Sequence, residues 1–190
     1  LLSALIHNLN RQQSRVRLFE IGLTFNRRSE DEPEIGFTQV GGLAQVSCIA
    51  GLVSGTTFPE QWNQDGRTAD FFDMKGDVEA LLALGRRENE FVFEPGSHPA
   101  LHPGQTASVS LEGRQIGLIG ALGPELARTL KLSDPVYLFQ LEVQALQEGR
   151  VPTYEAVSRF PAVRRDIAVV VDESVEAKSI AQCVGQSSPD

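Results

Sequence analysis

The amino-acid sequence predicts an α+β fold in which a mostly antiparallel sheet is flanked by helices. One observation is a pair of alternating runs in residues 106–122, joined across Glu112-Gly113-Arg114, which is typical of a β-hairpin. A second is the long run with little charge in residues 40–55, which favours a strand buried on both faces. A third is the helical spacing of apolar residues in 69–84, which predicts an amphipathic helix.

The beginning of the chain predicts a helix followed by a strand. Apolar residues at helical spacing indicate a helix over about residues 2–12, namely Leu2, Leu5, Ile6 and Leu9. This helix is apolar enough to belong to the core or to a subunit interface. Residues 17–25 alternate instead, and they predict a strand with one strongly apolar face, made of Phe19, Ile21, Leu23 and Phe25. The charged run that follows, residues 26–37, reads as an exposed loop.

The middle of the chain supplies the remaining elements of the predicted sheet. Residues 95–105 form a turn-rich connector, because Pro99 and Pro103 preclude a regular helix. After the hairpin, Pro124 stands at the favoured early position of a short helix. Residues 134–146 then predict a further strand.

The pattern changes near residue 150, where residues 148–161 have the polarity, Gly and Pro of a linker. Residues 164–173 predict a strand, and residues 174–186 predict the helix that follows it. We therefore expect two parts, residues 1–150 and residues 151–190, of which the second is only the start of a domain.

Composition and charge exclude several classes of function. The chain has 190 residues and a formal net charge of −8, so taken whole it is a poor binder of polyanions. No apolar run approaches the roughly 20 residues that cross a bilayer, and we expect no membrane partner. Cys48 and Cys183 lie far apart, which suits a reducing, cytoplasmic compartment. The first residue is Leu1 and not Met, so we expect a piece of a longer protein.

Two groups of side chains could bind a metal, but structural roles are favoured for both. His98 and His102 are four residues apart, yet prolines follow both, so we expect them to shape turns. Asp70, Asp73 and Asp77 could hold a hard cation. For these three carboxylates the favoured interpretation is a helix start, where acidic residues are stabilising.

No residue lies in a recognisable setting for a catalytic nucleophile, since G-x-S-x-G is absent, and no Gly-rich loop leads into Lys-Ser/Thr. The remaining signal is basic and consists of Arg159, Arg164 and Arg165. These residues are candidates for contact with phosphate. Alternatively, Arg164 pairs with Asp166, which lies two positions along the same strand face.

Six segments, found in the expected order, resemble the C-terminal half of the bacterial phenylalanyl-tRNA synthetase β subunit. The most specific is SRFPAVRRDIAVVVDE, which is similar to the opening of that subunit's ferredoxin-fold anticodon-binding domain. The others are VRLFEIGLTF, DFFDMKGDVEALL, LHPGQTASV, GLIGALGPEL and VYLFQLEVQAL. The resemblance implies that residues 1–150 are a degenerate copy of the class II synthetase catalytic domain, followed by a truncated ferredoxin-like fragment.

The resemblance also implies that this copy is non-catalytic. Active class II enzymes place cations around ATP, because adenylate formation builds negative charge on the α-phosphate. Arg27 and Arg28 are present, but they begin an acidic loop. The segment that resembles the Gly-rich, Arg-bearing strand carries Gln140, Glu142 and Gln144 and has neither glycine nor arginine. A carboxylate at that place would repel a phosphate.

The function implied by the resemblance is therefore that of a scaffold. The chain would pack against the catalytic α subunit, support a heterotetramer and help to position tRNA(Phe), with the three arginines in a supporting contact. The parent enzyme would use ATP and Mg²⁺, whereas this chain would hold neither and would expose a contiguous apolar patch for its partner. Two alternatives are a small free-standing metal-dependent enzyme with an acidic site at Asp70, Asp73 and Asp77, and a generic protein-interaction domain.

Overall fold

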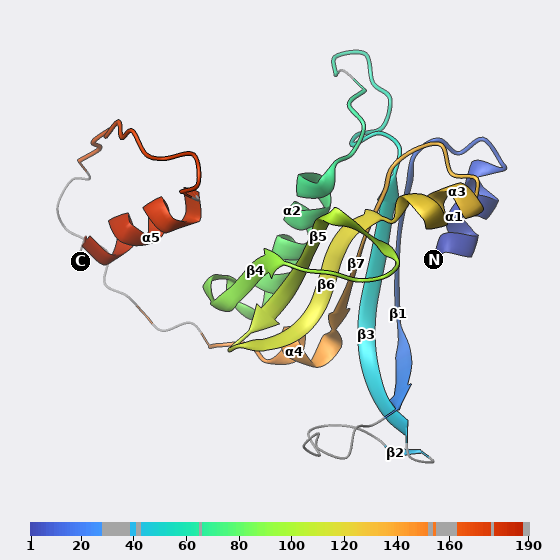
Figure 1. The fold of residues 1–190 in the computed structure, drawn as a ribbon, viewed down its shortest axis with the longest axis horizontal. Coiled ribbons are helices and arrows are strands. Elements are labelled where there is room, and N and C mark those ends of the chain that lie inside the picture. The colour runs from blue at the N-terminus through green and yellow to red at the C-terminus, as the bar shows by residue number, and fades with distance from the viewer. Residues whose placement is uncertain are drawn as a thin grey trace. The chain divides into compact units, whose positions relative to one another are not determined.

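The computed structural model describes residues 1–27, 39–40, 43–64, 66–151, 154, 163–175 and 177–187. The chain divides into two compact units, Leu1–Pro152 and Thr153–Asp190. The second unit contains α5 (Ala177–Ser187). The elements of the first unit, shown in Figure 1, are α1 (Leu2–Leu9), β1 (Val16–Arg27), β2 (Gln39–Val40), β3 (Leu43–Ser54), α2 (Phe71–Leu82), the 3₁₀ turns η1 (Ala83–Gly85) and η2 (Glu88–Glu90), β4 (Phe91–Pro95), β5 (Leu101–Leu111), β6 (Arg114–Leu122), α3 (Pro124–Thr129), β7 (Val136–Glu142) and α4 (Val143–Gln147).

The first unit is built on one antiparallel sheet in the order β1-β3-β7-β6-β5-β4, and the short β2 pairs with one end of β3. The predicted α+β class, an antiparallel sheet flanked by helices, is confirmed. The hairpin between β5 and β6 turns at the predicted position. Glu112 and Gly113 adopt the positive φ angles of 52° and 78° that a tight hairpin turn requires.

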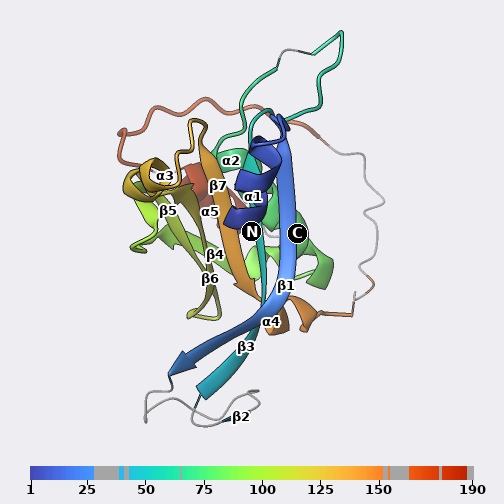
Figure 2. The ribbon, with the colours of Figure 1, turned by 90° about the vertical axis from the view of Figure 1, so that its right-hand side faces the viewer.

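Helices cover both faces of the sheet, as Figure 2 shows from the side. On one face, α2 buries Met74, Val78 and Leu82 in the main core, which continues into β6 and β7 through Ile119 and Leu141. On the other face, a smaller core joins α1 and α3 to the sheet. Its central side chain is Leu5, which is fully buried, so α1 contributes to the core.

The strands β1 and β3 are longer than the rest of the sheet. They pair with each other over twelve positions, from Val16 with Ser54 to Arg27 with Leu43, whereas β7 joins β3 only over Cys48–Ser54. The remainder of the pair extends past the other strands as a two-stranded ribbon, seen at the lower end of Figure 1. Two-stranded ribbons have little stability of their own in water, because they bury little apolar surface.

One corner of the unit is held by a nearly buried cation. Arg87 donates to Glu90 at 2.8 Å and to Glu112 at 2.6 Å, and it lies 3.6 Å from Glu148. These carboxylates belong to η2, to the hairpin turn and to the segment after α4. The amide of Arg150 also donates to the carbonyl of Gly85 at 3.0 Å. Arg87 therefore ties the end of the first unit to its sheet.

Some predicted boundaries are wrong. The first helix ends at Leu9, and the strand predicted over residues 134–146 ends at Glu142, where α4 begins. Part of the predicted connector is strand, since β5 begins at Leu101 and absorbs Pro103 in a register shift before Thr106. Such a bulge tolerates a proline because its backbone N–H is not needed for the ladder.

In the second unit, the predicted helix is confirmed as α5, but the predicted strand is not found. Residues 163–175 are exposed, and no strand is assigned among them. A strand exists only where a neighbouring strand satisfies its backbone groups. No helix in the described part of the chain is long and apolar enough to cross a membrane.

Candidate functional site

The most unusual surface of the first unit is an apolar stripe along β1. It consists of Phe19, Ile21, Leu23 and Phe25, whose side chains are between 55% and 73% exposed. These residues alternate along one strand, so they point to one face of the sheet. The sequence predicted the apolar face, but not that this face lies open to solvent.

The apolar stripe lies on the same face of the sheet as α2. Ile21 is paired with Ile49, and Phe19 with Gly51, on the strand that carries the main core. A groove of about 340 Å³ between α2 and β1 continues the apolar surface inward. Its apolar lining residues include Ile49, Met74, Leu81 and Phe139. α2 reaches β1 through the ion pair of Asp77 with Arg17, whereas the four side chains of the apolar stripe remain exposed.

The strand that bears the apolar stripe is also an edge strand. β1 pairs with β3 alone, so its second backbone edge is unpaired among the described residues. A long apolar edge strand is a typical place for association with another chain. The apolar stripe, the groove and the free edge therefore form one candidate interface.

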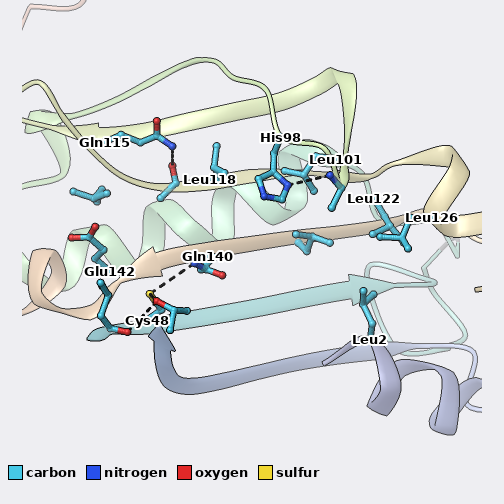
Figure 3. Close-up of a pocket in the computed structure, with 16 residues that line it drawn as sticks. Leu2, Cys48, His98, Leu101, Gln115, Leu118, Leu122, Leu126, Gln140 and Glu142 are labelled. Carbon is cyan, nitrogen blue, oxygen red and sulfur yellow. Dashed lines mark hydrogen bonds between the residues drawn. The ribbon is translucent and has the colours of Figure 1, made fainter. Parts of the chain in front are cut away.

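The opposite face of the sheet holds a hollow of about 370 Å³, drawn in Figure 3. One end is polar and contains Cys48, Thr24, Gln140 and Glu142, from β1, β3 and β7. The other end is apolar and is lined by Leu2, Leu101, Leu118, Leu122, Leu126 and Leu138. None of the described residues that line the hollow is lysine or arginine.

The polar end of the hollow does not fit the chemistry of ATP activation. Gln140 and Glu142 of β7 face the hollow, as Figure 3 shows, and Oε2 of Glu142 accepts from Arg114 at 2.5 Å. This ion pair uses the arginine to neutralise a carboxylate. Of the two arginines before the acidic loop, Arg27 ends β1 and has no described side chain, and Arg28 lies outside the described residues.

The acidic trio of α2 has structural partners. Asp70 is the N-cap, and its carboxylate accepts from the backbone amides of Phe72 and Asp73 at 2.8 and 3.0 Å. The carboxylate of Asp73 accepts two hydrogen bonds from Arg67, and Asp77 forms an ion pair with Arg17 of β1.

The three carboxylates thus serve a helix start and a contact between α2 and β1. No group of three or more potential metal ligands is found within the described part of the chain.

The two histidines shape turns, as predicted. Nδ1 of His98 accepts from the amide of Ala100 at 3.2 Å, and Nδ1 of His102 accepts from the amide of Gly104 at 3.1 Å. Each ring therefore supports the backbone two residues ahead of it.

The three arginines proposed to contact phosphate are not brought together by any described contact. Arg159 lies outside the described residues. Arg164 and Arg165 are exposed, and Nε of Arg164 lies 3.5 Å from Asp166. An ion pair that is this exposed contributes little to stability.

The chain is similar in shape to two solved structures, both of the pyrrolysyl-tRNA synthetase of Desulfitobacterium hafniense. One matches with a TM-score of 0.47 and 16% identity and covers 75% of this chain and 44% of that one. The other has a TM-score of 0.45 and 15% identity and covers 77% and 47%, respectively.

Comparison of sequences gives much stronger similarity. The phenylalanine–tRNA ligase beta subunit of Pseudomonas savastanoi pv. phaseolicola is 46% identical over 188 residues, which is 99% of this chain. That of Nitrosococcus oceani is 47% identical over 185 residues, or 97% of this chain. The chain spans only 22% of the length of either relative. The family model described as the phenylalanyl tRNA synthetase beta chain CLM domain matches residues 1–143. The chain therefore belongs to the phenylalanyl-tRNA synthetase beta chain family.

Proposed function

We propose that this chain is a non-catalytic structural module that packs against the catalytic α subunit of a phenylalanyl-tRNA synthetase. The observation that carries the proposal is the apolar stripe on β1. Four large side chains remain open on an edge strand, although burial of one such side chain is worth about 1.5–3 kcal/mol. A single apolar residue on a surface is common, but a row of four beside an apolar groove is typical of an interface.

The absence of lysine and arginine from the described lining of the hollow also supports the scaffold role. ATP-dependent activation of phenylalanine needs cations around the α-phosphate. The described residues that line the hollow provide Gln140 and Glu142 at the relevant strand and no positive charge. In this proposal ATP and Mg²⁺ belong to the α subunit, and this chain binds neither.

The second unit has a supporting role in the same proposal. Arg164 and Arg165 are exposed cations that lead into the segment resembling an anticodon-binding domain. They would contact phosphates of tRNA(Phe) and not its bases, and this contact would help to position the tRNA in a heterotetramer. Two cations supply only a modest part of such an affinity.

The test is a binding titration of the 190-residue chain with separately purified α subunit. Ile21→Ser and Leu23→Ser should each weaken binding by tenfold or more, since about 1.4 kcal/mol corresponds to one factor of ten. Leu84→Ser is the matched control, because Leu84 is 76% exposed on η1 and does not belong to the apolar stripe. The affinity of the Leu84→Ser variant for the α subunit should stay within about twofold of that of the wild type.

Two results would contradict the proposal. One is that the Ile21 and Leu23 variants bind the α subunit as tightly as the Leu84 variant. The other is phenylalanine-dependent pyrophosphate exchange by the chain without any α subunit, which would show that it is an enzyme by itself. Absence of any binding between the wild-type chain and the α subunit, together with absent exchange, would favour a generic interaction domain whose partner is another protein.

A further inference from the structure

We infer that the hollow between β7, β6, α1 and α3 is a binding site for a small amphipathic molecule. Its ligand would have a compact aliphatic body and a head group that donates hydrogen bonds, such as a primary ammonium or a hydroxyl group. The hollow opens on the face of the sheet opposite the apolar stripe, so this inference is independent of the subunit contact proposed above.

The size and the walls of the hollow define the body of the ligand. Its volume of about 370 Å³ lies within the range of sites for small organic molecules. Leu118, Leu126 and Leu138 are only half-buried there, although they belong to three different elements, β6, α3 and β7. An aliphatic group placed among them would remove apolar surface from water on several sides at once.

The polar end of the hollow determines which head group can bind, because the side-chain donors of Gln140 and Thr24 already point to acceptors of the protein. Nε2 of Gln140 points to Sγ of Cys48 at 3.9 Å, and the hydroxyl of Thr24 donates to the carbonyl of Val46 at 3.3 Å. Figure 3 shows the amide oxygen of Gln140 turned away from Cys48. That oxygen accepts no hydrogen bond from any described residue.

The second free acceptor is Glu142. Its Oε2 binds Arg114, whereas its Oε1 has no donor among the described residues. An ammonium or hydroxyl group can donate to the free oxygens of Gln140 and Glu142, and a carboxylate cannot. The described lining itself contains no lysine or arginine, and Arg114, which lies beside this end, is already paired with Oε2 of Glu142. A ligand carboxylate would therefore find no unpaired cation at this end.

His98 lies at the leucine end of the hollow, away from these acceptors, as Figure 3 shows. Its Nδ1 is already used by the amide of Ala100. The ligand would therefore place its head at Gln140 and its hydrocarbon chain toward His98.

The test uses three probes that share one hydrocarbon chain, namely hexylamine, hexanol and hexanoate. The 190-residue chain is titrated with each probe while the NMR signals of the methyl groups of Leu118, Leu126 and Leu138 are followed. Hexylamine and hexanol should shift these signals with a dissociation constant on the order of 1 mM, as expected for such small ligands. Hexanoate should bind at least about tenfold more weakly.

Three variants separate this site from other apolar surfaces. Leu118→Trp fills the hollow and should abolish the shifts at Leu126 and Leu138. Ile21→Ser changes the apolar stripe on the other face, so the shifts that the probes cause at Leu126 and Leu138 should be the same as in the wild type. Glu142→Gln should reduce the preference for hexylamine over hexanoate by at least about fivefold, because it removes the carboxylate that accepts from the ammonium group and leaves Arg114 without its partner.

The inference is overturned if none of the three probes shifts the leucine signals of the wild type, or if Ile21→Ser abolishes the shifts. It is also overturned if hexanoate binds as tightly as hexylamine, or if hexanoate places its head at His98. The wild-type titration maps the site by itself, so the result stands even if Leu118→Trp fails to fold.

Discussion

Asp73 serves two structural purposes at the start of α2. Its carboxylate accepts a hydrogen bond from the backbone amide of Asp70 at 2.8 Å, which completes a capping box. It also accepts hydrogen bonds from both terminal nitrogens of Arg67, at 2.6 and 2.8 Å. The hydrogen bonds from Arg67 are the largest cause that lowers the pKa of Asp73 from 3.8 to about 2, against the opposing effect of burial. Both contacts are stronger with the ionised carboxylate than with the protonated one.

This geometry predicts how stability depends on pH. Because the pKa of Asp73 is lower in the folded chain, its contribution is complete above about pH 4 and is lost as the pH falls through about 2. Asp73→Asn should lower the melting temperature by a few degrees near neutral pH, and most of the difference from the wild type should be lost by about pH 2. Thermal unfolding followed by circular dichroism across this range measures both curves.

Arg67→Met provides the complementary variant, since it removes the largest cause of the pKa shift and should move the acid-dependent loss of stability to higher pH. Arg128→Met, which changes an exposed arginine of α3, is the control and should leave the pH profile unaltered. A constant difference between wild type and Asp73→Asn from neutral pH to pH 2 would contradict this explanation.

Among the elements, β3 carries a tight packing constraint, because it lies between the edge strand and the rest of the sheet. Gly51 pairs with Phe19 of β1 and with Phe139 of β7. A Cβ atom at Gly51 would lie 2.5 Å from Cε1 of Phe139 and 3.2 Å from the carbonyl oxygen of Leu18. The missing side chain therefore lets the buried Phe139 ring lie across β3.

Two glycine substitutions should have opposite effects on stability. Gly51→Ala should destabilise the first unit by about 1–3 kcal/mol, because the buried ring of Phe139 would have to shift to make room for the added Cβ. Gly76→Ala should stabilise it by about 0.5–1 kcal/mol, since Gly76 is an exposed position of α2 with nothing within 4 Å of an added Cβ. Urea unfolding of both variants and of the wild type measures whether each substitution raises or lowers the free energy of unfolding. Equal effects would mean that Phe139 does not constrain β3.

Elements set by local spacing could be predicted from the sequence. The α2 pattern of Met74, Val78 and Leu82 identifies the buried side of that helix, and Glu112-Gly113 identifies the hairpin turn. Residues 164–173 are different, because their run of valines indicates a strand only if another strand is present to pair with it. Local pattern does not supply that neighbour.

The candidate interface could be predicted only in part, for a related reason. Alternation along β1 identifies Phe19 and Ile21 as members of one apolar face. Whether that face is covered depends on where α2 and α1 pack, which is a property of the tertiary structure. The apolar spacing of α1 is an equally strong local signal, yet Leu5 is fully buried and Ile21 is 60% exposed. The hollow could not be predicted from local patterns at all, because its lining comes from strands and helices that are distant in sequence.

At the scale of the whole molecule, the two faces of the sheet have different character. One face carries α2, the main core and the apolar stripe that is open at the edge strand. The other carries α1, α3 and a hollow without lysine or arginine among its described lining residues. This difference between the faces is the basis of the proposal that one face binds a subunit and that the other performs no adenylate chemistry.

The central claim, that the apolar stripe is covered by the α subunit, is tested most directly by hydroxyl-radical labelling of the chain with and without that subunit. Phe19 and Phe25 report on the apolar stripe, and Trp62 and Phe72, which are 97% and 74% exposed elsewhere, serve as internal controls. We expect labelling of Phe19 and Phe25 to fall at least about fivefold in the complex, as in a well-packed interface core, while Trp62 and Phe72 change little. Unchanged labelling of Phe19 and Phe25 in a complex that has demonstrably formed would contradict the account.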